Sequence, residues 1–347
     1  MALDLKKYGF TESIPSVHTQ GLPARIIAVH KERYALVSPH GECYGRLKAK
    51  QYFDGCEEFP TVGDFVLIQY NPNGDSQITK TLPRRTFFSR RDPSPGRGEQ
   101  AVAANFDYVF IMQSMNGNFN PRRLERYLTL GRQSGAVPVV VLTKADLAEE
   151  YGSYLRIAES LSAGAPVYAV SAKTGAGLND LAVFTEPGKT IVLLGSSGVG
   201  KSSLVYALAG CEIMTVGGIR ENDGKGRHTT THRQLISLPN GAMIIDTPGM
   251  RELGMWDVSC GLGDAFPDVE RYLGTCRFRN CRHQSEPGCA IKEAIEKGNL
   301  SRERWESYLR LKAEAEYAED KHSLLRQKQQ KFINIAKINK RDNLTNS

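Results

Sequence analysis

The stretch "LLGSSGVGKSSL", residues 193–204, decides the fold because it contains the phosphate-loop pattern G-x-x-x-x-G-K-[ST]. The apolar residues 190–194 precede it as an expected strand, and residues 202–210 follow it with helix-forming types. Backbone N–H groups in such a loop surround phosphate oxygens, and the helix N-terminus adds positive potential. The sequence therefore predicts a nucleotide site made by Gly195, Ser196, Ser197, Gly198, Val199, Gly200, Lys201, Ser202 and Ser203.

Two side chains of this loop and one further motif have predicted roles at the phosphates. Lys201 is expected to bridge the β- and γ-phosphates, and Ser202 to bind Mg²⁺. The motif "DTPG", residues 246–249, ends the apolar strand "AMIID". We expect Asp246 to hold magnesium through water and the N–H of Gly249 to meet the γ-phosphate, which makes this segment a nucleotide sensor.

Two motifs that precede the loop predict recognition of guanine. "TKAD", residues 143–146, ends an apolar strand, and its aspartate can accept hydrogen bonds from N1–H and the amino group of guanine. Adenine lacks this donor pair, so the motif favours GTP over ATP. "SAK", residues 171–173, ends the next apolar strand, and its backbone is expected to contact O6. The predicted base-binding residues are Thr143, Lys144, Asp146, Ser171, Ala172 and Lys173.

The order of the motifs predicts a circularly permuted GTPase domain. Base motifs usually follow the phosphate loop, but here they precede it, which is tolerable because the termini of compact domains often lie close together.

Residues 222–234 are the predicted first switch, in which Thr230 completes the magnesium shell with Ser202 and Asp246. The residue after DTPG is Met250, where many GTPases have a water-orienting glutamine, so we predict slow intrinsic hydrolysis.

His228 is our candidate for positioning the attacking water, and a purely structural role for this histidine is the alternative. The predicted catalytic residues are then His228, Lys201 and Thr230.

Residues 21–82 predict a small barrel. Five segments with period-two alternation, beginning at residues 24, 33, 43, 65 and 76, are separated by Gly, Pro and Asn turns. This spacing suits an oligonucleotide-binding (OB) barrel, and an SH3-like barrel is the alternative. The following residues 82–98 contain five arginines around Phe87 and Phe88, which fits binding of single-stranded RNA or, equally, anchoring of a linker to a core.

The late cysteine cluster predicts one structural zinc ion. The spacing is C-x4-C-x-H-x5-C, and three thiolates with one imidazole complete a tetrahedral ligand set. Free thiols are the alternative, but four soft ligands within 14 residues favour zinc. The predicted ligands are Cys276, Cys281, His283 and Cys289.

The expected architecture is a multidomain α/β protein. It comprises an OB-like RNA-binding barrel with linker (1–98), a permuted GTPase domain with helices on both faces of a parallel sheet (99–264), a helical zinc domain (265–320) and a basic tail (321–347). The net charge of +7 is compatible with a polyanionic partner. The sequence contains no apolar run of the roughly 18 residues that span a membrane, which favours a cytoplasmic protein.

With these motifs in place, the chain resembles the ribosome small subunit-dependent GTPase A family, the RsgA or YjeQ type. The phrases "GSSGVGKSSL", "GRHTTT", "DTPG" and "CRFRNCRH" carry the resemblance, which covers about residues 20–320. It implies a late-acting bacterial assembly factor whose GTPase is stimulated by the small (30S) ribosomal subunit. The barrel and zinc domain would contact 16S rRNA, with nucleotide state controlling the association. The chain departs from the commoner pattern at Thr143, where Asn is usual, which puts a contact behind the base in doubt.

Other functions are also compatible with the sequence. The chain could be a GTP-switched RNA-binding regulator with negligible turnover, or a paralogue of the family that acts on another RNA. A P-loop kinase or ATPase is disfavoured by Asp146 and DTPG. We expect a monomer that binds GTP, Mg²⁺ and Zn²⁺ and has no membrane partner.

Overall fold

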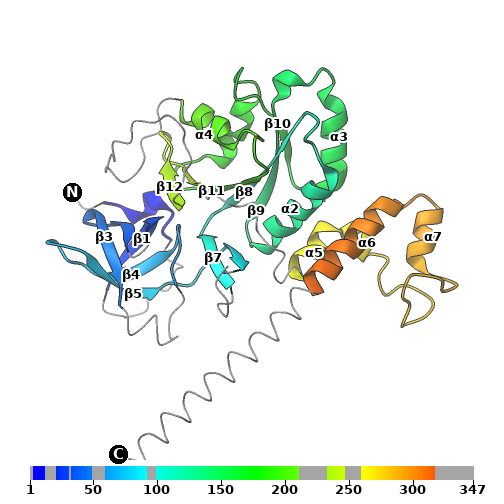
Figure 1. Ribbon diagram of the computed structural model, residues 1–347, viewed down its shortest axis with the longest axis horizontal. Helices are drawn as coiled ribbons and strands as arrows, with labels where there is room; N and C mark the ends of the chain where they lie inside the picture. Colours follow the sequence, from blue (N-terminus) through cyan, green and yellow to red (C-terminus); the bar gives the residue numbers. More distant parts are fainter. Residues whose placement is uncertain are drawn as a thin grey trace, which may run out of the picture. The chain divides into compact units, whose positions relative to one another are not determined.

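The computed structural model describes residues 3–11, 21–30, 33–48, 59–91, 99–210, 233–246 and 259–316. Contacts divide the chain into two compact units (Figure 1), of which one is Met1–Phe88 with Ala101–Glu252 and the other is Ser89–Gln100 with Leu253–Ser347. The four domain ranges expected from the sequence stay predictions.

The N-terminal part of the first unit is the closed five-stranded barrel that the alternation predicted, coloured blue in Figure 1. It follows a short 3-10 helix, η1 (Leu5–Tyr8). Its strands are β1 (Leu22–Val29), β2 (Tyr34–Ser38), β3 (Gly41–Leu47), β4 (Phe65–Gln69) and β5 (Ser76–Thr81). They pair in the order β1-β2-β3-β5-β4, and β4 returns to β1. Alternate side chains such as Ala24, Ile26, Leu36, Val66 and Ile78 fill the interior.

The C-terminal part of the first unit is the predicted parallel sheet. Its strands are β8 (Tyr108–Ser114), β9 (Val137–Thr143), β10 (Val167–Ala169), β11 (Thr190–Gly195) and β13 (Met243–Asp246), with the antiparallel β12 (Arg233–Ser237) beside β13. The order is β10-β9-β8-β11-β13-β12, so the strand that leads into the phosphate loop is central. Continuous burial of β11 explains its unbroken apolar sequence.

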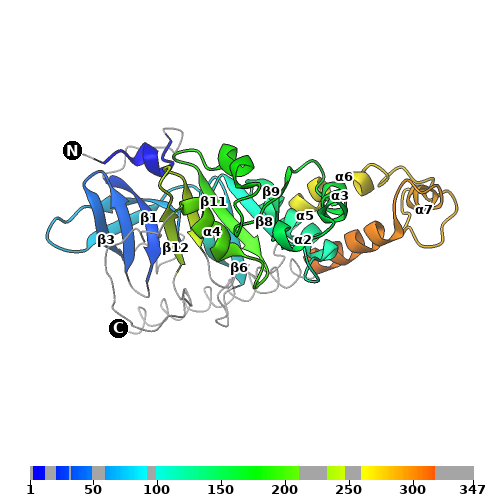
Figure 2. The same cartoon turned by 90° about the horizontal axis from the view of Figure 1, so that it is seen from above.

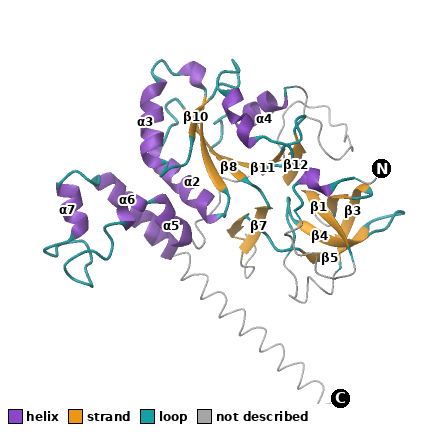
Figure 3. Ribbon diagram, turned by 180° about the vertical axis from the view of Figure 1, so that it is seen from behind, coloured by secondary structure: helices purple, strands orange, loops and turns teal. Residues whose placement is uncertain are grey.

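Helices cover both faces of this sheet, as predicted. The structure contains α2 (Pro121–Gln133), α3 (Tyr151–Leu161) and α4 (Lys201–Ala209), with the 3-10 segments η2 (Ala145–Leu147) and η3 (Leu178–Phe184) (Figure 3). Leu204 of α4 packs in one cluster with Phe110 of β8. Gly131 of α2 lies against Ile111 instead. Because neighbouring residues of a strand point to opposite faces, α2 and α4 lie on opposite sides of the sheet.

The barrel and the sheet are continuous, which the sequence did not reveal. Strand β1 pairs antiparallel with β12 through Ala28–Gln234 and Val29–Arg233. All strands named so far therefore belong to one eleven-stranded sheet, and β1 and β12 lie side by side in Figure 2. Strand β12 is thus covered on both edges.

The linker after the barrel is largely an anchor. Arg84 makes two hydrogen bonds to the fully buried Asp64, at 2.9 and 2.8 Å. Phe88 is buried and stacks on Phe106 with ring centroids 5.0 Å apart, whereas Phe87 is exposed. Of the two roles considered for this segment, Arg84 and Phe88 take the structural one. The segment also forms a two-stranded sheet of β6 (Phe87–Arg91) and β7 (Glu99–Ala104).

The second unit is mainly helical, as expected. It contains α5 (Ser259–Ala265), α6 (Pro267–Glu270), α7 (Ala290–Glu296) and a helix over 302–316. The Arg304 guanidinium joins these elements, because it pairs with Asp268 at 2.9 Å and lies 3.9 Å above the ring of Phe266. The predicted tail 321–347 lies outside the described residues. Among the residues that are described, no helix combines the length and apolarity needed to cross a bilayer.

Candidate nucleotide and zinc sites

A pocket of about 280 Å³ lies where the ends of β9 and β10 meet the start of α4. It brings together residues from the TKAD motif, the SAK motif and the phosphate loop, which are far apart in sequence. Its lining is Thr143, Lys144, Asp146, Leu147, Val170, Ala172, Lys173, Gly200, Ser203 and Leu204. The predicted guanine motifs and the phosphate loop therefore form one cavity.

Asp146 is held in place by Ser171, which is not among the residues that line the pocket. The buried Ser171 hydroxyl donates a hydrogen bond of 2.6 Å to Asp146 Oδ1. This bond is the main reason that the pKa of Asp146 lies below its ordinary value of 3.8. The carboxylate is therefore ionised at neutral pH and can accept hydrogen bonds from a donor pair such as that of guanine.

Thr143 links the base motif to the phosphate loop. Its hydroxyl lies 2.6 Å from the carbonyl oxygen of Val199 and 3.3 Å from that of Gln113. Threonine at this position, where Asn is commoner, thus makes a contact to the loop, and a weaker contact behind the base stays a prediction. Neighbouring Lys144 has a left-handed backbone conformation (φ 62°). Residues other than glycine rarely adopt this conformation, and where they do it is often at functional sites.

The phosphate loop has the geometry that its sequence predicts. Gly195 lies in a tight place, because a Cβ there would be 3.0 Å from both Met112 O and Val199 Cγ1. Gly200 has φ 101° and is the N-cap of α4, whose first amide groups lack partners within the helix. The Lys201 ammonium donates to the carbonyl oxygens of Gly195 and Ser196 at 2.7 and 2.8 Å. This cation and the helix N-terminus provide the positive potential that phosphates require.

Most of the remaining predicted residues lie outside the described residues or at their edge. His228, Thr230 and Gly249 lie outside the described residues. Asp246 is described for its backbone alone, at the end of β13. Ser202 is exposed in the first turn of α4, where its hydroxyl is accessible to a cation. Magnesium binding by Ser202, Thr230 and Asp246 therefore remains a prediction.

Sequence reasoning missed the apolar part of the pocket and a support of the loop. Leu147, which is 61% exposed, Val170 and Leu204 line the pocket and suit the flat faces of a base. The signal available in the sequence was the leucine that directly follows Asp146. The Asn118 amide donates to Ser196 Oγ at 3.2 Å, and the Arg123 guanidinium contacts the Asn118 carbonyl. No short sequence pattern indicates that Asn118 and Arg123 would support the phosphate loop.

The cysteine cluster forms a site that fits zinc. Ligand atoms of Cys276, Cys281, His283 and Cys289 all lie within 4.8 Å of one another. His283 Nδ1 is 3.4 Å from the sulfur atoms of both Cys276 and Cys289. Atoms bound at about 2.0–2.3 Å around one tetrahedral zinc lie roughly 3.5–3.8 Å apart, so small shifts of these side chains would complete the site. The donor set of three sulfurs and one nitrogen matches structural zinc.

Residues around the cluster fix its turn. The Glu286 carboxylate accepts hydrogen bonds from the backbone N–H groups of Arg282, Gln284 and Ser285, at 2.9, 3.0 and 3.1 Å. These bonds, with that from Arg282 the largest contribution, lower the pKa of Glu286 to about 2. The Trp305 ring meets the edge of His283 with centroids 5.5 Å apart. Both contacts restrict the imidazole-bearing turn before any metal binds.

Comparison with known families gives one clear similarity. Residues 81–256 match the family described as RsgA GTPase. The chain is 42% identical over 343 residues to "Small ribosomal subunit biogenesis GTPase RsgA 2" of Listeria monocytogenes, covering 96% of each chain. It is 43% identical to the protein named "Small ribosomal subunit biogenesis GTPase RsgA" of Xanthomonas oryzae, covering 89% of this chain and 85% of that one.

Solved structures agree with this similarity. YjeQ from Thermotoga maritima superposes with a TM-score of 0.63 at 26% identity, over 84% of this chain and 96% of its own. YloQ, described as a circularly permuted GTPase, gives a TM-score of 0.59 at 25% identity, over 88% of this chain and 98% of its own. The permuted order inferred from the motifs is therefore also the order of a solved relative.

Proposed function

Since the chain belongs to the RsgA GTPase family, as its motifs predicted, we propose that it hydrolyses GTP while bound to the small (30S) ribosomal subunit, late in the maturation of that subunit. Membership makes it a GTPase, a hydrolase that acts on GTP. The observation that supports the proposal is that Asp146, held by Ser171, lines the same pocket as Ser203 and Leu204 of the helix after the phosphate loop.

The proposed roles follow the chemistry of each residue. Asp146 and the SAK segment select guanine, and the amide groups of residues 195–203 surround the phosphates. Lys201 stabilises negative charge that develops on the β- and γ-phosphates. Ser202, Thr230 and Asp246 would hold magnesium, which supplies charge neutralisation when it is bound. His228 is the proposed residue that orients the attacking water, and Gly249 the proposed sensor of the γ-phosphate.

The proposed macromolecular partner is the 16S rRNA of the small subunit. On the barrel, His40 stacks on Tyr70 with ring centroids 4.4 Å apart, and Tyr70 is 37% exposed. The Arg33 guanidinium lies 3.9 Å over the ring of Tyr44. In the zinc-binding turn, exposed Phe278 lies between Arg277 and Arg279. Exposed rings such as Tyr70 and Phe278, with arginines elsewhere on the same surfaces, are suited to unpaired bases and phosphates.

Such a partner places the protein in the cytoplasm, where we propose that it acts as a monomer with one zinc ion. Nucleotide state would control its affinity for the rRNA, because loss of the γ-phosphate releases the DTPG segment that precedes the second unit.

The decisive test measures GTP hydrolysis by the protein under three conditions: without additions, with purified small ribosomal subunits, and with bulk RNA. We expect the small subunit to raise kcat strongly and bulk RNA to leave it unchanged. Equal turnover in all three conditions would favour a GTP-switched RNA-binding regulator. Stimulation by a different RNA particle would instead indicate a paralogue with another substrate.

A further inference from the structure

One row of the sheet connects the barrel to the DTPG motif. Ala28 of β1 lies opposite Gln234 of β12, and Gln234 lies opposite Asp246 of β13. Neighbouring strands are about 4.8 Å apart, so the barrel backbone is roughly 10 Å from the backbone of Asp246. The pairing of β1 with β12 covers two residue pairs, Ala28–Gln234 and Val29–Arg233. Such a short ladder needs further support to keep the barrel strand on the sheet.

Arg25 supplies a second attachment of the same barrel strand. Its side chain is fully buried, and its guanidinium donates to Thr190 Oγ1 at 3.1 Å and lies 3.5 Å from Met243 Sδ. Thr190 and Met243 are the first residues of β11 and β13 and lie directly opposite each other. Strand β1 therefore contacts the start of β13 through Arg25, and it is connected to the end of β13 through β12.

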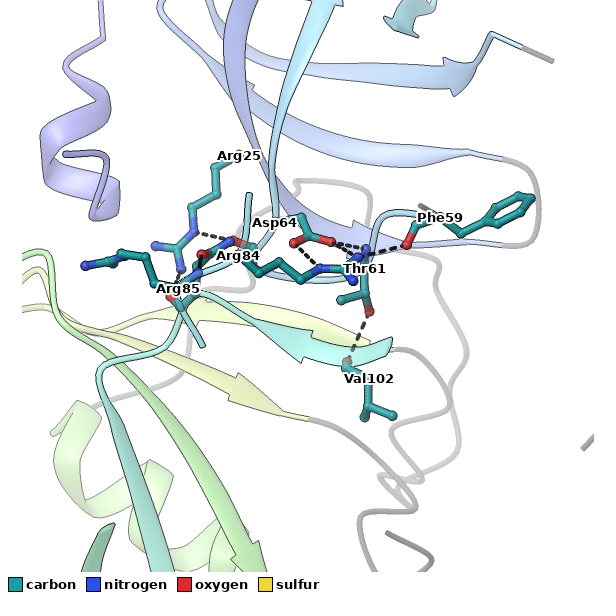
Figure 4. Close-up of polar contacts among 9 residues, drawn as sticks. Arg25, Phe59, Thr61, Asp64, Arg84, Arg85 and Val102 are labelled. Atoms are coloured by element: carbon teal, nitrogen blue, oxygen red, sulfur yellow. Dashed lines mark hydrogen bonds and ion pairs between the residues drawn. The ribbon is translucent and has the colours of Figure 1, made fainter. Parts of the chain in front are cut away.

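The remaining donors of Arg25 reach three other segments: the loop before β4, the residue after β7, and η1. They bond to the carbonyl oxygens of Gly63 at 3.3 Å, Asn105 at 2.9 Å, and Tyr8. Figure 4 shows Arg25 pointing into this junction beside Arg84 and Arg85. The junction is tight, because a Cβ on Gly63 would lie 2.0 Å from Ala104 O. A planar guanidinium with five donors can serve these acceptors together, whereas a lysine ammonium cannot.

Burial leaves Arg25 charged in this position. Desolvation lowers the pKa of Arg25 to about 10, still well above neutral pH. The neighbouring Asp107 opposes that shift, and its carboxylate also accepts the backbone N–H of Thr190 at 2.8 Å. Arg25 is thus a permanent cation held at the starts of the strands that lead to the phosphate loop and to DTPG.

We propose that Arg25 is a positioning residue for Asp246. By keeping β1 on β12, it holds the end of β13 in register with β11, and so fixes the backbone of Asp246 relative to the phosphate loop. The barrel is then a structural part of the magnesium site as well as a surface for RNA. This inference rests on the proposed role of Asp246 in holding magnesium.

The test measures how nucleotide affinity depends on magnesium in the full chain. Fluorescent GDP is titrated in excess EDTA and then over a range of Mg²⁺ concentrations, for the parent and for Arg25→Met. In EDTA we expect equal affinities, because the base pocket and the phosphate loop are unchanged. Mg²⁺ raises the affinity for GDP, and the Mg²⁺ concentration that gives half of this gain should be about tenfold higher in Arg25→Met. A tenfold change is the lower bound when a residue that supports a metal ligand is lost. Arg25→Lys should restore only part of the difference.

Two further variants keep the test decisive. Thr190→Val removes one acceptor of Arg25 at nearly constant volume, so it should shift the magnesium dependence in the same direction even where Arg25→Met folds poorly. Arg84→Met breaks the buried pair of Arg84 with Asp64, which joins the linker to the barrel and contacts neither β11 nor β13 in the bonds described above. It should lower Tm, on the order of 10 °C, and leave the magnesium dependence unchanged.

The outcomes separate the inference from the function on which it rests. Arg25→Met and Thr190→Val could lower Tm and leave the magnesium dependence of GDP affinity unchanged. Arg25 would then have a purely structural role, and the inference would be overturned. An equal magnesium shift in Arg84→Met would overturn it too, because general loosening would then suffice. If the parent itself shows no magnesium-dependent affinity and Asp246→Asn changes nothing, the proposed magnesium role of Asp246 fails instead.

Discussion

The hydroxyl of Thr143 donates a hydrogen bond of 2.6 Å to the carbonyl oxygen of Val199. Thr143 belongs to the base motif and Val199 to the phosphate loop, and both side chains are buried. The segment with the base motif and the phosphate loop are therefore joined directly by a side-chain hydrogen bond.

Replacing Thr143 by Val should weaken binding of GTP and GDP alike. Loss of the bond leaves a buried carbonyl with one partner fewer, at a cost of about 1–2 kcal/mol, or roughly tenfold in Kd. Fluorescent-nucleotide titration measures this change. Thr129→Val is the matched control, because the Thr129 hydroxyl is also buried but bonds within α2, to Glu125 O. Equal affinity losses in the two variants would refute a linking role for Thr143.

Replacing Asp146 by Asn should change which base is accepted. The ionised carboxylate accepts two donors from guanine, so its loss should reduce GTP affinity on the order of 10²–10³-fold. An amide donates to the C2 oxygen of xanthine, so xanthosine triphosphate should replace GTP as the better substrate. Competition between the two nucleotides in a hydrolysis assay gives the result. Asp180→Asn, at an exposed aspartate of η3, should leave GTP preferred. A variant at Asp146 that still prefers GTP would exclude its role in base selection.

Replacing Glu286 by Gln should weaken zinc binding. The carboxylate orients backbone amides on either side of His283, and such supports affect metal affinity by about tenfold or more. A chromophoric chelator in competition for zinc measures the change. Glu293→Gln, which removes an exposed partner of Lys297 on α7, should have no effect. Comparable zinc release from the two variants would rule out this role of Glu286.

The same carboxylate has a defined pH dependence. Its pKa is about 2 in the folded chain and 4.5 ordinarily, so folding favours the ionised form. The stabilisation is complete above about pH 4.5 and is lost as the pH falls toward 2. In Glu286→Gln this contribution to the acid unfolding curve should be missing.

Features with a local signal were predictable from the sequence. Period-two alternation identified all five barrel strands, and Asn120 with Pro121 gave the start of α2, where the Asn120 side chain accepts the Arg123 N–H. The base motifs and phosphate loop were each found from short patterns, and the structure brings them into one pocket. The cysteine spacing likewise identified a cluster whose ligand atoms converge.

Features that depend on distant segments were not predictable. Arg25 occupies what looks like an ordinary solvent-facing position of an alternating strand, because nothing near residue 25 indicates that β11 and β13 will cover it. The pairing of Ala28 with Gln234 has no counterpart in local periodicity either. Arg84 and Phe88 matched an RNA-binding composition, and their burial is decided by Asp64 and Phe106, which lie about 20 positions away.

The continuity of barrel and sheet also sets an order of events during synthesis. Gln234 follows Ala28 by 206 positions (234 minus 28). At bacterial-type rates of roughly 5–20 residues per second, about 10–40 s separate the emergence of β1 from that of its outer neighbour. The barrel can close on itself meanwhile through β1 and β4, but the eleven-stranded sheet is completed only once β12 has emerged. Nascent chains that stop before residue 233 therefore carry a finished barrel without a finished GTPase sheet.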